Sequence, residues 1–294
     1  SEVLTTEEWC KQEPLKDHTT FRIGGVADYY VVPSTMEHLK HVVEYLRQNQ
    51  IHHYILGKGS NVLFSDDGFR GVVVELGSGL EDITWLDDTQ MEAQAGISLA
   101  RLANEAANKG LSGLEFASGI PGTLGGAVTM NAGAYGGEMK DCITEVTVLD
   151  QAGQEKILTC EQLQLGYRSS VIQTEGYLVL SARMKLVPGD TEKIRATMRE
   201  LNKRRREKQP LEYPSAGSTF KRPEGYFAGK LIDDAGLRGL RHGGAQVSEK
   251  HCGFVVNIDN ATCKDVLQLI SVVQKTVRDK FGVELETEIK IIGE

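Results

Sequence analysis

The chain lacks the features that mark several common classes of protein. Its five cysteines are odd in number and contain no CxxC pair, which is typical of reduced thiols in a cytoplasmic protein and not of a disulfide framework or zinc site. No apolar run is long enough to span a bilayer, so we expect no membrane partner. The 33 Lys and Arg are outnumbered by 41 Asp and Glu, and the net charge of −8 argues against nucleic acid as a partner.

Histidine clusters suited to a metal are also missing. Two pairs, His38 with His41 and His52 with His53, have no third ligand nearby in the sequence, so we expect no metal site. There is no internal repeat or low-complexity segment. A chain of 294 residues can bury a sizeable core without disulfides.

Helix and strand signals alternate along the chain. Helices are predicted where apolar residues recur every three or four positions, and strands where they alternate or cluster between turns. The helices are expected at 34–49 (with a Ser34/Glu37 capping box), 98–109, 191–208, 226–234 and 262–281, and the strands at 28–32, 53–56, 69–76, 83–86, 91–95, 146–150, 156–159, 177–186, 253–258 and 283–292.

Two glycine-rich stretches interrupt these elements. GKGSN at 57–61 lies between two predicted strands, and its alternate glycines allow successive N–H groups to face one concavity. GIPGTLGGAVTMNAGAYGGEM at 119–139 has seven glycines and no Lys, Arg or His. It is either a bare turn or a cradle of backbone amides for an anionic ligand. A nucleotide or dinucleotide cofactor would suit two such loops; neither is a Walker A loop.

The two glycine stretches together resemble the flavin-binding part of the UDP-N-acetylenolpyruvoylglucosamine reductases. The resemblance continues through TTFRIGG (19–25), YRSS (167–170), SAGSTFKRP (215–223) and LETEIKIIG (285–293), nearly the whole chain in the right order. YRSS is followed at short range by the strand at 177–186, so the chain resembles the shorter form of the family, without the insertion that carries a substrate-covering tyrosine.

The resemblance implies an α+β fold with three parts. These are an FAD-binding subdomain of βαβ-like character (1–80), a second FAD-binding subdomain with a larger mixed or antiparallel sheet (81–189), and a C-terminal α/β substrate-binding domain (190–294). The FAD-binding module is similar to that of the vanillyl-alcohol-oxidase-like proteins.

The same resemblance implies that FAD is the cofactor and that NADPH is the co-substrate. No histidine lies in either glycine stretch, so we expect FAD to be noncovalent. The residues expected to bind it are Gly57, Lys58, Gly59, Ser60, Asn61, Gly119, Ile120, Pro121, Gly122, Thr123, Gly125, Gly126, Asn131, Ala132 and Gly133.

The implied reaction reduces the enolpyruvyl ether of UDP-N-acetylglucosamine enolpyruvate to UDP-N-acetylmuramate in peptidoglycan precursor synthesis. Hydride addition leaves negative charge on the α-carbon and carboxylate, so the site needs a cation, a hydrogen-bonding acid and a proton donor. The family motifs place these roles at Arg168, Glu288 and Ser218. Without the resemblance, the three residues read as an arginine at a strand end, a solvated glutamate and a turn serine.

The substrate also carries a UDP diphosphate. The resemblance places basic residues of NKRRREKQP near it, with Lys208 first and Arg204, one helical turn back, second. Tyr167, Arg222 and His251 are further substrate-side residues, although some relatives have asparagine at the position of Arg222. A basic helix end that is only solvated is the competing interpretation.

Two other functions compete with this one. Another FAD-dependent oxidase or dehydrogenase built on the same module would lack the Arg–Ser–Glu set and consume oxygen with an alcohol or amine. A nucleotide-binding module without redox chemistry would bind a nucleotide and leave it unchanged.

Overall fold

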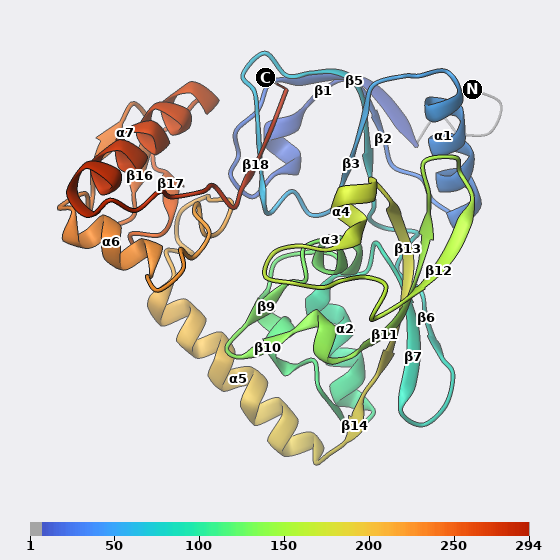
Figure 1. The fold of residues 1–294 in the computed structure, drawn as a ribbon. Coiled ribbons are helices and arrows are strands. Elements are labelled where there is room, and N and C mark those ends of the chain that lie inside the picture. Colours follow the sequence, from blue (N-terminus) through green and yellow to red (C-terminus); the bar gives the residue numbers. More distant parts are fainter. Residues whose placement is uncertain (1–7, 294) are drawn as a thin grey trace. The chain divides into compact units, whose positions relative to one another are not determined.

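The structure is a computed structural model that describes residues 8–293, and its fold is α+β (Figure 1). By contacts along the chain it divides into two compact units, which are described separately. The first contains residues 8–10, 30–58 and 72–205, and the second 11–29, 59–71 and 206–293. The predicted three-part division at 80 and 189 stays a prediction.

Four elements run from one unit into the other. They are β1 (Trp9–Pro14), β2 (Val26–Val31), β5 (Phe69–Glu75) and α5 (Thr191–Lys208). The strands belong to a four-stranded sheet of order β1-β2-β5-β3, in which β3 (His53–Leu56) pairs in parallel with β5. The parallel pair and the helix before β3 agree with the βαβ-like pattern expected from the sequence.

The first unit is built around a five-stranded antiparallel sheet of order β12-β11-β13-β7-β6. Its further elements are β6 (Ile83–Trp85), β7 (Gln90–Gln94), β8 (Leu111–Ser112), β9 (Gly133–Ala134), β10 (Gly137–Glu138), β11 (Ile143–Leu149), β12 (Glu155–Thr159), β13 (Leu178–Lys185), β14 (Val187–Pro188), α1 (Met36–Gln48), α2 (Leu99–Asn108), α3 (Leu124–Thr129), α4 (Val171–Glu175), η2 (Glu115–Gly119) and η3 (Met139–Asp141). One apolar core unites α1, α2, α3 and the sheet. Short α3 packs on β13 and β7, which fixes the glycine-rich stretch to the sheet.

The second unit has its own core beneath helix α7. Its further elements are η1 (Leu15–His18), β4 (Val62–Phe64), α6 (Ala228–Asp234), β15 (Arg241–His242), β16 (Ala245–Val247), β17 (Val255–Asn257), α7 (Cys263–Phe281) and β18 (Lys290–Ile292). Thr262 and Asp265 form a capping box at the start of α7, and Gly282 ends it in the left-handed conformation. These local signals explain why the sequence located this helix correctly.

Three sequence expectations were wrong in detail. The N-cap of α1 is Thr35 and not Ser34, because the Thr35 hydroxyl accepts from the His38 N–H group. The expected strand at 283–292 is regular only at Lys290–Ile292, where it pairs in parallel with β4, a strand of three residues. Helix α3 was not predicted, since glycine disfavours helix. No helix of residues 8–293 is long and apolar enough to cross a membrane.

Candidate active site

The GKGSN loop presents a row of unused backbone donors. None of the N–H groups of residues 57–61 has an acceptor in residues 8–293. The carbonyl of Gly59 is held by the Thr20 N–H at 3.1 Å. Gly59 is left-handed (φ +60°), and a Cβ there would lie 2.1 Å from the carbonyl oxygen of His18. Only glycine fits, and the resulting loop has the character of an anion-binding nest.

The start of this loop meets the second glycine stretch within the first unit. A Cβ on Gly57 would lie 2.6 Å from Oγ1 of Thr123. Thr123 is buried and caps α3, where its hydroxyl accepts from the Gly126 N–H. The N–H groups of Gly122 and Thr123 also have no acceptor in the described part of the chain. The two stretches therefore offer neighbouring free amides, as a phosphate-binding cradle requires.

Four of the predicted cofactor residues contact protein groups directly. Gly125 lies against Ala95, where a Cβ would come 3.0 Å from the alanine Cβ, and Gly133 lies against Glu138. Ala132 is buried. The buried amide of Asn131 donates to Glu138 Oε2 (2.6 Å) and accepts from the Lys140 N–H (3.0 Å). These contacts shape the stretch, and contact of the four residues with a cofactor stays a prediction.

Arg168 sits at the tip of a tight turn between Gly166 and Ser169. The N–H of Ser169 donates to the carbonyl of Gly166, and Arg168 has φ +52°, a conformation that side chains other than glycine rarely adopt. Its guanidinium donates to the carbonyl of Gly133 at 3.4 Å and lies over the ring of Tyr167. A strained arginine retained at a turn is typical of a functional site.

Asn131 connects this turn to the glycine stretch. Its Nδ2 also donates to the carbonyl of Gly166 at 3.1 Å. Ser170, buried directly after the turn, donates to the carbonyl of Thr129 in α3. The turn that carries Arg168 is thus held to the stretch that was predicted to bind the cofactor.

Ser218 and Glu288 are brought together in the second unit. The N–H of Glu288 donates to the carbonyl of Thr219 at 2.8 Å, and Phe220 pairs with Thr287 as an antiparallel bridge. Thr219 is buried, and its Oγ1 accepts from the Val255 N–H. Ser218 is half-buried, and its hydroxyl has no partner in residues 8–293. Its proton is therefore available to a ligand.

The glutamates of LETE follow the alternation that was expected. Leu285 and Ile289 are buried, whereas Glu284 and Glu286 are exposed. Glu288 is half-buried, and its carbonyl accepts from Nδ2 of Asn61 at 3.2 Å. Glu288 is thus the more enclosed of the glutamates on its face, and it is joined to the GKGSN loop.

The predicted substrate residues lie in varied surroundings. Arg204 is exposed and pairs with Glu200 one helical turn back (2.8 Å), and Lys208 is exposed at the end of α5. Arg222 lies over the exposed ring of Phe227, with Cζ 4.0 Å from the centroid. His251 packs edge-on against Phe254, and burial lowers its pKa. His251 is thus a neutral side chain at pH 7.

Sequence reasoning missed two residues of α5 that contact the glycine stretch. Arg205 donates to the carbonyl of Gly119, and Asn202 donates to Oγ of Ser118 at 3.2 Å. A Cβ on Gly119 would lie 2.3 Å from Oδ1 of Asn202. The three-residue spacing of Asn202 and Arg205 on one helix face was the available signal.

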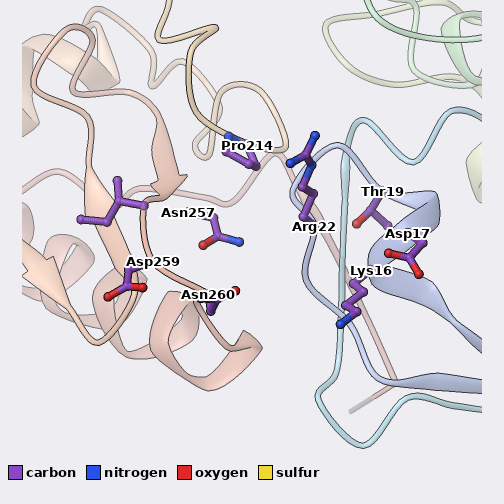
Figure 2. A pocket seen from close by; sticks show the side chains of 9 residues that line it. Lys16, Asp17, Thr19, Arg22, Pro214, Asn257, Asp259 and Asn260 are labelled. Carbon is purple, nitrogen blue, oxygen red and sulfur yellow. The ribbon is translucent and has the colours of Figure 1, made fainter.

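A separate polar pocket of about 650 Å³ lies within the second unit (Figure 2). Lys16, Asp17, Thr19 and Arg22 form one wall, and the opposite wall is formed by Pro214, Asn257, Ile258, Asp259 and Asn260. None of the predicted site residues lines it. Part of its wall is structural, since the buried Asn257 amide donates to the carbonyl of Phe21.

Comparison with known proteins agrees with this arrangement. Residues 209–292 match the family model of the UDP-N-acetylenolpyruvoylglucosamine reductase C-terminal domain, and residues 27–160 match that of an FAD binding domain. A UDP-N-acetylenolpyruvoylglucosamine reductase of Caldanaerobacter subterraneus subsp. tengcongensis is 54% identical over 100% of this chain and 96% of its own. One from Clostridioides difficile (strain 630) is 52% identical over 99% and 96%.

A solved structure is also similar over nearly all of the chain. The crystal structure of UDP-N-acetylenolpyruvylglucosamine reductase from Thermus caldophilus has a TM-score of 0.81 at 38% identity, covering 97% of this chain and 98% of that one. The expected family, the α+β fold and FAD as cofactor are thereby confirmed. The chain belongs to the UDP-N-acetylenolpyruvoylglucosamine reductase family of FAD-dependent oxidoreductases.

Proposed function

We propose that the chain reduces the enolpyruvyl ether of UDP-N-acetylglucosamine enolpyruvate to UDP-N-acetylmuramate, with NADPH as electron donor, in peptidoglycan precursor synthesis. The observation that carries this proposal is the backbone pairing of Glu288 with Thr219, which holds a glutamate beside a serine with an unused hydroxyl. A competing oxidase on the same module has no use for this pair.

The cradle residues suit noncovalent FAD. The free amides of GKGSN and of Gly122 and Thr123 would hold its diphosphate, since backbone N–H groups bind phosphate oxygens without a covalent link. When bound, the flavin accepts hydride from NADPH and delivers it to the alkene carbon of the substrate. All other steps fall to side chains of this chain.

Arg168, Glu288 and Ser218 then take distinct roles. The planar guanidinium of Arg168 binds the substrate carboxylate, whose charge grows as hydride arrives. The Glu288 carboxylic acid hydrogen-bonds the developing enolate oxygen. The Ser218 hydroxyl transfers its proton to the α-carbon. A serine hydroxyl is a weak acid, but a carbanion is a strong enough base to take its proton, which solvent then replaces.

Exposed basic residues would bind the UDP moiety. Lys208 and Arg204 lie four residues apart on α5, which places them on the same helix face for contact with a diphosphate. Tyr167, Arg222 and His251 complete the proposed substrate contacts. Arg222 already lies over an aromatic ring, so its guanidinium is held within reach of a planar ligand group.

An anaerobic titration tests the function. The purified protein is expected to be yellow, to bleach with NADPH, and to regain its colour when the enolpyruvyl UDP-sugar is added, with UDP-N-acetylmuramate as product. Recolouring by oxygen alone, with an alcohol as the effective electron donor, would support the competing oxidase. A protein that stays colourless with added FAD would support the non-redox nucleotide module and contradict the proposal.

A further inference from the structure

Arg205 lies directly against the start of the second glycine stretch. Its guanidinium donates to the carbonyl of Gly119. A Cβ added to Gly119 would come 3.4 Å from Cδ of Arg205, so the helix and the stretch are in close contact at this point. Asn202, one turn earlier on α5, fixes the neighbouring Ser118. The position of the Arg205 side chain is therefore set from two directions.

The charge of this guanidinium is not balanced by the protein. Arg205 forms no ion pair with any carboxylate in residues 8–293 and uses only the carbonyl of Gly119 as an acceptor. Other arginines of the same unit do pair: Arg204 with Glu200, Arg101 with Glu81, and Arg183 with two glutamates. Arg205 is also partly buried, and burial lowers its pKa. A cation withdrawn from water needs an anionic partner, and a guanidinium still has N–H groups to offer one.

The glycine stretch beside it needs a cation. It contains no Lys, Arg or His of its own, and its free amides at Gly122 and Thr123 lie a few residues from Gly119. Backbone amides supply only partial positive charge, whereas a diphosphate carries two full negative charges. Arginine matches phosphate oxygens with two parallel hydrogen bonds.

We propose that Arg205 binds the diphosphate of a nucleotide ligand held on the glycine stretch that begins at Gly119. This inference rests on the proposed function, which supplies two sources of that group: FAD and the UDP-sugar. Arg205 would anchor the diphosphate by charge and keep the Gly119 carbonyl turned away from it.

The test compares Arg205→Gln, Arg205→Lys and, as a matched control on the same helix, exposed Arg199→Gln. Apoprotein prepared from the full chain is titrated with FAD and separately with riboflavin, which lacks the diphosphate, and flavin fluorescence gives each Kd. UDP is titrated into the holoprotein and followed by the flavin spectrum. Tm and circular dichroism show whether each variant is folded.

The expected result is at least a tenfold rise in the Kd of FAD for Arg205→Gln, an unchanged Kd of riboflavin, partial recovery in Arg205→Lys, and no effect in Arg199→Gln. An unchanged Kd of FAD with a tenfold weaker Kd of UDP would also support the proposal and assign the diphosphate to the substrate. Unchanged Kd values for both ligands would overturn it. Equal loss of FAD and riboflavin binding would also overturn it, because a general effect on the stretch would explain that loss.

A second variant separates charge from packing. Asn202→Ala removes the neighbouring contact with Ser118 but leaves the guanidinium. It should bind FAD with nearly wild-type affinity, and a loss as large as that of Arg205→Gln would contradict a role in charge. Failure of the wild-type protein to bind FAD is a different outcome: it contradicts the proposed function, while the UDP titration, then made on the protein as purified and followed by calorimetry, still tests Arg205.

Discussion

The backbone N–H of Glu288 donates to the carbonyl of Thr219 at 2.8 Å. The pairing continues through Lys221, whose N–H donates to the carbonyl of Glu286. Two segments far apart in the sequence thus run side by side, and the residue before Thr219 is Ser218. This local relationship joins the proposed proton donor to the proposed acid without any contact between their side chains being required.

Ser218→Ala should separate the two half-reactions. Reduction of the flavin by NADPH is expected to stay near the wild-type rate, whereas reoxidation by the enolpyruvyl substrate should slow by about 10²–10⁴-fold because the α-carbon loses its proton donor. Anaerobic stopped-flow absorbance measures both steps. Ser215→Ala is the control: its hydroxyl lies in the same loop and accepts only from the Gly217 N–H. Equal slowing of both half-reactions would contradict the assignment.

Gly57→Ala should reveal the contact with Thr123. The added Cβ meets Oγ1 at 2.6 Å, so the variant should lose about 1–3 kcal/mol of stability and bind FAD more weakly. Thr123→Ala alone should cost about 1 kcal/mol through the lost helix cap. In the double variant the collision is gone, so the combined loss should be smaller than the sum. Thermal unfolding of the three variants gives this comparison, and strict additivity would show that the loops do not meet there.

Substitutions at Arg168 should separate strain from chemistry. Glycine tolerates φ +52° and alanine does not, so Arg168→Gly should melt above Arg168→Ala, by an amount corresponding to about 1 kcal/mol. Both variants should lose most of the activity, and Arg168→Lys should recover only part of it, because an ammonium cannot bind a carboxylate in two-point fashion. Tm and steady-state rates test this. Equal Tm values for the Gly and Ala variants would argue against the left-handed turn.

Stability should fall at alkaline pH. Burial raises the pKa of Tyr54 from 10.0 to about 12 and that of Cys142 from 9.0 to about 12. The unfolded chain releases these protons first, so their contribution is fully present below pH 9 and is lost as the pH rises toward 12. For Tyr54 this contribution is about 2 kcal/mol.

Tyr54→Phe tests the tyrosine part of this dependence. The variant cannot ionise, so its Tm should fall less steeply than that of the wild type between pH 9.5 and 11.5. Tyr45→Phe, at a side chain that is 61% exposed, should leave the slope unchanged. Parallel slopes for Tyr54→Phe and the wild type would contradict a buried phenol.

Elements with strong local signals were predictable from the sequence. Strand β3 was expected at its observed bounds, and α7 has its capping box and terminal glycine within the sequence of the helix itself. Helix α3 could not be predicted in this way: its glycines disfavour helix, and it forms because Thr123 caps it and Gly125 fits against Ala95 on the sheet.

The sequence by itself determined the family, the order of the motifs and the residue types available for chemistry, because these depend on which residues occur and in what order. Only the tertiary structure decided that Ser218 lies beside Glu288, that the Asn131 amide holds the Arg168 turn, and that Arg205 is the arginine that faces Gly119. Each of these relationships joins segments that are distant in the sequence or depends on which side of a helix is covered. Local periodicity carries no information about such contacts, which follow from how the sheets and helices pack.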